Sequence, residues 1–152
     1  MQVLITGVTG MVGSHLADYI LDAHPEVIVH GLTRWRSPIE NIRHLDGRIR
    51  LHHADLTDLA SLMRLLDTAA PNRIFHLAAQ SYVTTSFSAP VDTLATNVLG
   101  TTNLLEAVRL SGGHPRIHVC SSSEVYGQVE ENDLPISESQ PFRPASPYAV
   151  SK

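Results

Sequence analysis

The chain has 152 residues, of which 43% are hydrophobic and 17% charged, a balance typical of one globular domain and not of a disordered segment. Its formal charge of −4, without a run of Lys or Arg, argues against nucleic acid or an acidic membrane as a partner. No segment approaches the roughly 18 consecutive apolar residues that span a membrane, and a single cysteine, Cys120, excludes an internal disulfide. We therefore expect a cytoplasmic protein that binds neither nucleic acid nor membrane.

Apolar runs alternate with helical patterns along the chain, as in βαβ units built around a parallel sheet. Strands are predicted over residues 3–6, 27–32, 49–53, 73–77 and 117–121. Helices are predicted over residues 12–23, 58–69 and 92–111. The fold class that follows is α/β, a Rossmann-type doubly wound parallel sheet in a single domain.

A glycine loop, G-x-x-G-x-x-G, lies between the first strand and the first helix. Gly7 permits a tight turn, Gly10 lets backbone N–H groups approach a pyrophosphate, and Gly13 lets helix and strand pack closely. The positive end of the helix dipole then faces the phosphates. The alternative is a purely structural turn, but the position of the loop favours dinucleotide binding. The predicted contacts here are Gly7, Thr9, Gly10, Met11, Val12 and Gly13.

The end of the second strand indicates which dinucleotide binds. A ribose 2′-OH would require a carboxylate there, yet the first acidic residue after this strand is Glu40. Arg34 and Arg36 instead suit a 2′-phosphate through forked, charge-assisted hydrogen bonds. Two arginines on a surface loop are the alternative. We expect NADP(H), with NAD as the second choice.

The third and fourth strands end in residues suited to the same crevice. Asp55 could accept a hydrogen bond from the adenine amino group, or it could cap the following helix, as Thr57 also could. The fourth strand ends in small residues, against whose backbone a cofactor can lie. The predicted contacts are Asp55, Leu56, Leu77, Ala78, Ala79 and Gln80.

Candidate catalytic residues follow the fifth strand and lie at the end of the chain. Ser122 belongs to a hydroxyl cluster that turn chemistry alone could explain, but the carboxylate of Glu124 just beyond is harder to explain that way. Tyr148 and Lys152 are four residues apart and share one helix face, where the ammonium can activate the phenol. Such a pair arises by chance in many helices, but its combination with the glycine loop and a strand-end serine favours catalysis.

The remaining segments carry weaker signals. Residues 129–147 form a polar, proline-rich loop, either a lid or a linker, and a helix begins near Pro147. Because that helix has barely begun at Lys152, we expect the N-terminal part of a longer protein whose small C-terminal substrate lobe is absent. No grouping has metal-ligand spacing, so no metal is expected. Cys120 is expected to fill a core position.

Together these motifs resemble the extended short-chain dehydrogenases/reductases, the NAD-dependent epimerase/dehydratase family that acts on nucleotide sugars. The resemblance covers essentially the whole chain and includes Asn97, which it places at the cofactor together with Tyr148 and Lys152. Within that family the chain is most similar to GDP-mannose 4,6-dehydratases, on residues 34–37, 41–45, 51–58, 79–83 and 122–124. Those dehydratases commonly carry Gln-Asp where this chain has Met11-Val12. The segments 128–129 and 148–152 look as much like GDP-6-deoxy-4-keto-mannose reductases.

The resemblance implies a GDP-mannose 4,6-dehydratase, a hydro-lyase that recycles its NADP. Tyr148 would take the proton of the sugar 4-OH while hydride leaves C4, and Ser122 would hydrogen-bond that oxygen. Glu124 would remove the C5 proton and protonate the departing 6-hydroxyl before hydride returns to C6. Lys152 would be the fourth catalytic residue that the resemblance implies. GDP-mannose is the expected substrate, and a homodimer or homotetramer the expected assembly.

Two alternatives remain. An NADPH-dependent GDP-4-keto-6-deoxy-mannose reductase, or another 4-epimerase or dehydratase of nucleotide sugars, would use Ser122, Tyr148 and Lys152 in a different reaction. A non-enzymatic dinucleotide sensor is disfavoured, because it would have no use for an activated phenol at Tyr148.

Overall fold

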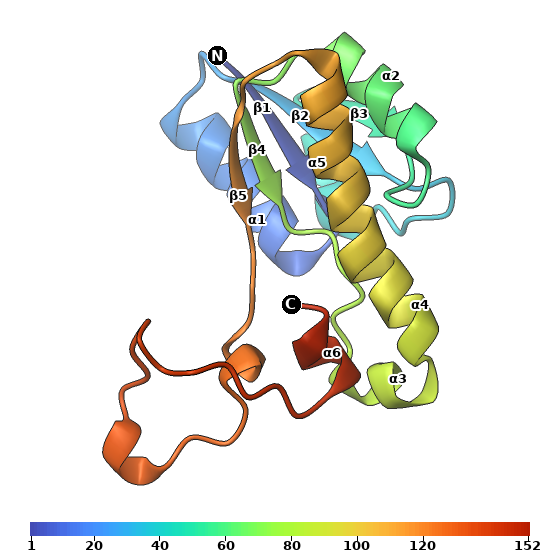
Figure 1. The fold of residues 1–152 in the computed structure, drawn as a ribbon. Coiled ribbons are helices and arrows are strands. Elements are labelled where there is room, and N and C mark those ends of the chain that lie inside the picture. The colour runs from blue at the N-terminus through green and yellow to red at the C-terminus, as the bar shows by residue number, and fades with distance from the viewer.

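Five parallel strands form one sheet in the computed structural model, which describes residues 1–152 (Figure 1). The strands are β1 Gln2–Thr6, β2 Ile28–Thr33, β3 Arg50–His53, β4 Arg73–His76 and β5 Arg116–Val119. Their order is β3-β2-β1-β4-β5. The connection reverses direction between β1 and β4, which is where ligands bind in doubly wound sheets. The predicted Rossmann-type α/β fold is confirmed.

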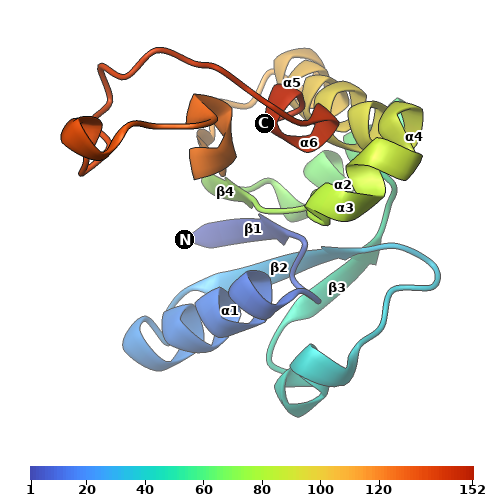
Figure 2. The same cartoon turned by 90° about the horizontal axis from the view of Figure 1, so that it is seen from below.

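Helices cover both faces of the sheet (Figure 2). One face carries α1, Met11–Ala23, and the other carries α2, Leu59–Ala69, and α5, Gly100–Ser111. The chain reaches α5 through α4, Pro90–Leu94, and a π-helical turn over Ala95–Leu99. The other short elements are α3 Val83–Ser88, α6 Pro147–Val150 and the 3-10 helices η1 Glu40–Leu45, η3 Ser123–Tyr126 and η4 Glu131–Asp133.

Two apolar clusters hold these layers together, because successive side chains of a strand point to opposite faces of the sheet. Val3, Ile5 and Val29 pack with α1 and η1 on one face. Leu4 and Leu32 pack with α2 and α5 on the other. The strands of the sheet centre are therefore buried on both sides, as their near-continuous apolar sequences predict.

The structure differs from the sequence predictions mainly in its short elements. The predicted helix 92–111 begins at Pro90 and contains the π turn, and neither η1 nor α3 was expected. Segments of six residues are too short to display a helical period. Ile42 and Leu45 of η1 are nevertheless buried, so tertiary packing fixes this turn.

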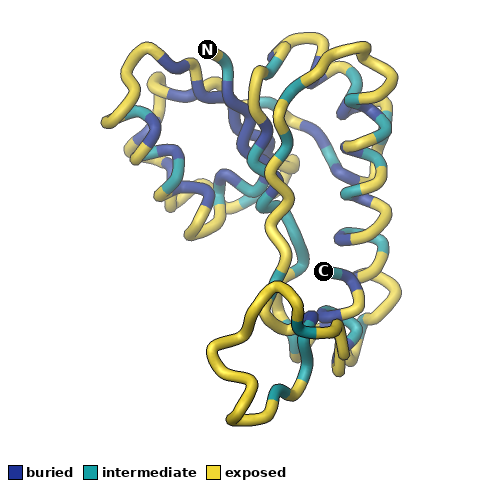
Figure 3. The backbone as a smooth tube through the Cα atoms, turned by 60° about the vertical axis from the view of Figure 1, so that its left-hand side comes forward, coloured by how far each residue is buried: buried dark blue, intermediate teal, exposed yellow.

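The loop between η3 and α6 projects from the body of the molecule and is mostly exposed (Figure 3). Its two ends are held together at the base, where the Arg143 N–H donates to the Val125 carbonyl over 2.9 Å. The rings of Tyr126 and Phe142 pack beside this bond with centroids 5.5 Å apart. The predicted long loop is confirmed, and so is the helix that begins at Pro147.

None of the helices combines the length and the apolar character that crossing a membrane requires.

Two histidines, the buried His30 and the half-buried His52, form a pair on the α2/α5 face. His30 Nε2 lies 2.8 Å from Gln2 Oε1, and His30 Nδ1 lies 2.8 Å from His52 Nε2. The amide oxygen can only accept, so the Nε2 of His30 carries the proton and His52 donates to Nδ1. Burial, followed by the positive charges of His52 and Arg50, lowers the pKa of His30 from 6.5 to about 4. Burial also lowers the pKa of His52.

This pair predicts a loss of stability in mild acid. The unfolded chain takes up a proton on His30 below pH 6.5, whereas the folded chain resists it until about pH 4. The free energy of unfolding should therefore fall across that interval, by up to about 1.4 kcal/mol per pH unit and per group. When thermal unfolding of the full-length protein is followed as a function of pH, His30→Gln should make the free energy of unfolding fall less steeply below pH 6.5. His114→Gln, at an exposed histidine, should keep it. Equal slopes in both variants would contradict the assignment.

Candidate active site

The glycine loop brings three backbone segments into contact. Gly7 has a φ of +75°, and a Cβ there would lie 2.8 Å from the Ala78 nitrogen at the end of β4. A Cβ on Gly13 would collide with the carbonyl oxygen of Gly7. The tight turn expected at Gly7 and the close packing expected at Gly13 are therefore confirmed. Any side chain at either position would push apart β1, α1 and the end of β4.

The first turn of α1 is open to an anion. Gly10 caps the helix, and Met11 and Val12 are 71% and 58% exposed. No acidic residue lies in this turn, so the partial positive charge of the helix end is not neutralised. The cradle left by the glycines and this helix end fit a pyrophosphate.

Arg34, Trp35 and Arg36 follow β2 and are all exposed, with Trp35 at 84%. Their loop is held by the Arg34 N–H, which donates to Ser37 Oγ over 2.9 Å. Asn41 Nδ2 donates to the Thr9 carbonyl over 3.0 Å and so ties the next segment to the glycine loop. Arg34 and Arg36 therefore stand exposed at the end of β2, and their role at a cofactor stays a prediction.

Asp55 follows β3 and holds its own turn. Its Oδ1 accepts from the backbone N–H and the hydroxyl of Thr57, over 2.8 and 2.7 Å. These bonds lower the pKa of Asp55, and the positive charge of Arg34 adds to the effect. The sequence offered Asp55 or Thr57 as the N-cap of α2, and both are wrong. Asp58 caps this helix, because its side chain accepts from the Ala60 N–H over 3.0 Å.

Asn97 joins the end of β4 to α6. Its Oδ1 accepts from the Gln80 N–H over 2.7 Å, and its Nδ2 donates to the Gln80 carbonyl over 3.0 Å. The second hydrogen of Nδ2 reaches Ser151 Oγ over 2.8 Å. Asn97 is buried at 3% exposure. The residues Leu77–Gln80 are half-buried, and Leu77 and Ala78 lie against Gly7; their contacts with a cofactor stay a prediction.

The segments that carry the candidate catalytic residues meet at the ends of β4 and β5. Helix α6 packs against η3 and is capped by Ser146, whose side chain accepts from the Ala149 N–H over 3.0 Å. Ser121 Oγ donates to the Lys152 carbonyl over 3.0 Å. The structure thus brings the turn that holds Tyr148 and Lys152 beside the segment that holds Ser122 and Glu124.

The environment of each of these four side chains differs. Ser122 Oγ accepts from the Glu124 N–H over 3.2 Å and is half-buried, which leaves its own hydrogen available to a ligand. Glu124 is exposed, and Tyr148 is half-buried. Lys152 is also half-buried, and this burial lowers the pKa of its ammonium.

Cys120 is exposed beside Lys152, so the expectation of a core cysteine is wrong. The strand β5 ends at Val119, one residue before it, and lies at the edge of the sheet. Every residue of β5 is exposed or half-buried, so the side chain that follows this strand has no core to enter.

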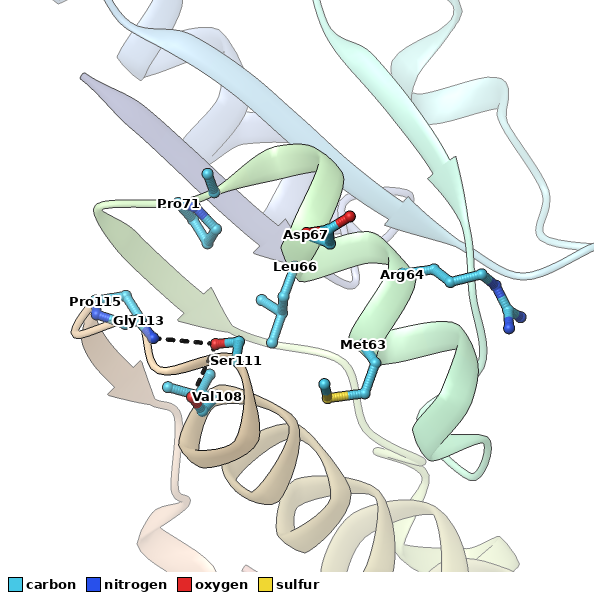
Figure 4. A pocket seen from close by; sticks show the side chains of 10 residues that line it. Met63, Arg64, Leu66, Asp67, Pro71, Val108, Ser111, Gly113 and Pro115 are labelled. Atoms are coloured by element: carbon cyan, nitrogen blue, oxygen red, sulfur yellow. Dashed lines mark hydrogen bonds between the residues drawn. The ribbon is translucent and has the colours of Figure 1, made fainter.

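A cavity of about 510 Å³ lies elsewhere, between the C-terminal ends of α2 and α5 (Figure 4). Met63, Leu66 and Val108 line it. Pro71 and Pro115 also line it, and these precede β4 and β5, at the end of the sheet opposite the glycine loop. The cavity is therefore separate from the candidate site. No group of three or more His, Cys, Asp or Glu side chains is placed to hold a metal ion.

Comparison with known proteins gives one family. The family model for GDP-mannose 4,6-dehydratase matches residues 4–152. The GDP-mannose 4,6-dehydratase of Yersinia enterocolitica is 40% identical over 99% of this chain and 42% of its own length. The human GDP-mannose 4,6 dehydratase is 37% identical over 98% of this chain and 42% of its own length. The chain therefore spans less than half the length of these relatives.

Solved structures agree on the fold. UDP-glucose 4-epimerase from Thermus thermophilus, complexed with NAD, superposes with a TM-score of 0.88 at 33% identity, over the whole of this chain and 47% of the epimerase. RMD from Pseudomonas aeruginosa, complexed with NADPH, superposes with a TM-score of 0.79 at 37% identity, over 99% of this chain and 45% of RMD. The fold, the glycine loop and the match over nearly every residue lead to one conclusion: the chain belongs to the GDP-mannose 4,6-dehydratase family.

Proposed function

We propose that this chain is the cofactor-binding and catalytic part of a GDP-mannose 4,6-dehydratase. The observation that carries the proposal is the contact between η3 and α6, the two turns that bear the proposed catalytic residues Ser122, Glu124, Tyr148 and Lys152. Membership of the dehydratase family supplies the reaction and the substrate class. The carboxylate of Glu124 favours a dehydratase over a reductase, because only the elimination of water needs a second acid–base group.

NADP is the proposed cofactor, with NAD as the alternative. Bound there, its nicotinamide would supply reversible hydride transfer at the sugar carbons. Two exposed arginines and the lack of a carboxylate at the end of β2 support the 2′-phosphate. The residues proposed to hold the cofactor are Gly7, Thr9, Gly10, Met11, Val12, Gly13, Arg34, Arg36, Asp55, Leu56, Leu77, Ala78, Ala79, Gln80, Asn97, Tyr148 and Lys152.

The protein groups then divide the proton transfers between them. Tyr148 takes the proton of the sugar 4-OH, and the ammonium of Lys152, four residues on, stabilises the phenolate. Ser122 donates its free hydrogen to the same sugar oxygen, where negative charge develops. Glu124, exposed on η3, removes the C5 proton and delivers it to the departing 6-hydroxyl, which leaves as water. Tyr148 then returns to C5 the proton that it took from the 4-OH, which completes the 4-keto-6-deoxy product.

The rest of the proposal concerns the whole protein. We propose that residues 1–152 form one NADP-binding domain, followed in a longer protein by a substrate lobe. The shares of 42% to 47% that the chain covers in its relatives support this. A cytoplasmic homo-oligomer, a dimer or tetramer, is the assembly we propose.

The function is tested by incubating the full-length protein with GDP-mannose and NADP⁺. A 4-keto-6-deoxy product should form without net consumption of reductant. Stoichiometric oxidation of NADPH by a 4-keto-6-deoxy sugar, with GDP-mannose left unchanged, would instead identify a reductase.

Glu124→Gln isolates the elimination step, because it removes the carboxylate and keeps the shape. Product formation should fall by about a hundredfold or more, the range for loss of a general acid–base group, while the affinity for NADP⁺ stays unchanged. Glu138→Gln, at an exposed glutamate of the projecting loop, is the matched control and should behave as wild type. Full turnover by Glu124→Gln would rule out the role assigned to this residue.

Arg34→Gln tests the choice of cofactor. Loss of a charge-assisted bond to the 2′-phosphate should weaken NADP⁺ binding by about tenfold to a hundredfold and leave the affinity for NAD⁺ nearly unchanged. Titration calorimetry with both cofactors measures the two effects. Arg64→Gln on the exposed face of α2 is the control. A parallel loss of both affinities would show that Arg34 does not read the phosphate.

A further inference from the structure

His76 is a buried imidazole that the proposed proton transfers do not use. It is the last residue of β4, between β1 and β5, and is 3% exposed. Its Nδ1 lies 2.8 Å from Thr6 Oγ1 on β1. Its Nε2 lies 2.9 Å from Thr101 Oγ1 on α5. One imidazole therefore connects the sheet to the helix layer at the end of the sheet that holds the candidate site.

The hydroxyl groups fix the direction of these bonds. Thr101 Oγ1 gives its single hydrogen to the Asn97 carbonyl over 2.6 Å, so it must accept from His76 Nε2. The Nδ1 of a neutral ring then accepts from Thr6 Oγ1, which in turn accepts from the Ala78 N–H over 3.1 Å. The chain of bonds runs in one direction, and every hydroxyl hydrogen in it has an acceptor.

The two ends of this chain of bonds lie in the two halves of the site. Thr6 precedes Gly7, and Ala78 is the residue that Gly7 approaches most closely, so one end is the cofactor cradle. At the other end Asn97 donates to Ser151 Oγ, which donates to the Tyr148 carbonyl over 2.7 Å. That end is the turn of α6.

We propose that His76 is a positioning residue, whose ring sets the distance between the glycine-loop cradle and the turn that carries Tyr148 and Lys152. The bond to Thr6 holds the cradle, and the bond to Thr101 holds the π turn of Asn97 and, through it, α6. The proposal rests on the proposed function in one respect, that α6 is the catalytic turn.

The neutral ring is the form that this role requires. Burial, followed by the positive charge of Lys152, lowers the pKa of His76 from 6.5 to about 4. A second ring proton would turn Nδ1 into a donor and leave the hydroxyl hydrogen of Thr6 without its acceptor. At neutral pH the ring therefore keeps one donor and one acceptor, each matched to its threonine.

Thr101→Val, a nearly isosteric change, removes the bond between His76 and Thr101 and so tests whether that bond positions α6. The full-length variant should lose turnover of GDP-mannose by about tenfold, the size expected for one lost hydrogen bond between partly buried groups. Its affinity for NADPH should stay within about twofold of wild type. Thr102→Val is the matched control, because Thr102 makes the same bond to the carbonyl four residues earlier but has an exposed side chain. It should leave both quantities unchanged.

Two substitutions of His76 separate its two bonds. The amide oxygen of His76→Asn can replace Nδ1 toward Thr6, so this variant should keep NADPH affinity and lose kcat. The amide nitrogen of His76→Gln can replace Nε2 toward Thr101, so it should bind NADPH more weakly and keep most of its kcat at saturating cofactor. A purely structural role would lower the thermal midpoint of both variants without this split.

The fluorescence of bound NADPH reports on the position of the α6 turn in the absence of the sugar substrate. The emission should change in Thr101→Val and not in Thr102→Val, because only the former loosens the turn near the nicotinamide. Wild type that binds NADPH but leaves GDP-mannose unchanged would refute the proposed function alone. Equal kcat, NADPH affinity and emission in Thr101→Val and Thr102→Val would overturn the role of His76 alone.

Discussion

The primary amide of Asn97 makes three hydrogen bonds, through its oxygen and both its N–H hydrogens, and so holds two distant segments against one helix. Gln80, at the end of β4, takes one bond from the amide nitrogen and gives one to the amide oxygen, and Ser151 of α6 takes the remaining hydrogen. An amide buried to this degree would cost about 1–3 kcal/mol for each partner removed. The π turn over Ala95–Leu99 is where the helix carries this residue, in keeping with the tendency of such turns to mark functional sites. Helix α6 also packs against α3, α4 and η3, and Ser121 bonds to its end, but Asn97 is the residue that ties it to the end of β4.

The site divides its residues into those that are fixed and those that are open. Thr6, His76 and Asn97 are buried and hydrogen-bonded, whereas Glu124, Arg34 and Met11 are exposed. This arrangement follows from the fold, since parallel strands place their carboxyl ends along one edge and the connecting segments rise from it. The buried layer carries no chemistry of its own. It fixes the backbone that carries the exposed, flexible side chains, so that these side chains bind a ligand from defined positions.

Much of this could be predicted from the sequence, because the signals were periodic or stereochemical. Each strand was placed to within two residues, and the tight turn at Gly7 follows from glycine spacing. The helix cap at Asp58, the π turn and the exposure of Cys120 were not predicted. Three candidates for the cap, Asp55, Thr57 and Asp58, lie within four residues, and only the path of the chain after β3 selects among them. The exposure of Cys120 goes with that of β5, whose residues are exposed or half-buried although the strand sequence is apolar at alternate positions, so it depends on tertiary packing and not on local sequence.

His30 and His76 show why the role of a buried histidine is hard to infer from sequence. Both lie in apolar strands, on the same face of the sheet, and burial lowers the pKa of both to about 4. The bonds of His30 go to Gln2 and His52, two strand residues, so the ring only joins strands that the sheet already joins. The bonds of His76 go to Thr6 on a strand and Thr101 on a helix, which are joined by no backbone ladder. An imidazole whose partners are otherwise free to move apart can control a distance, and one whose partners are already fixed can only add stability. The difference lies in the element that each partner belongs to, and strand periodicity alone does not reveal it.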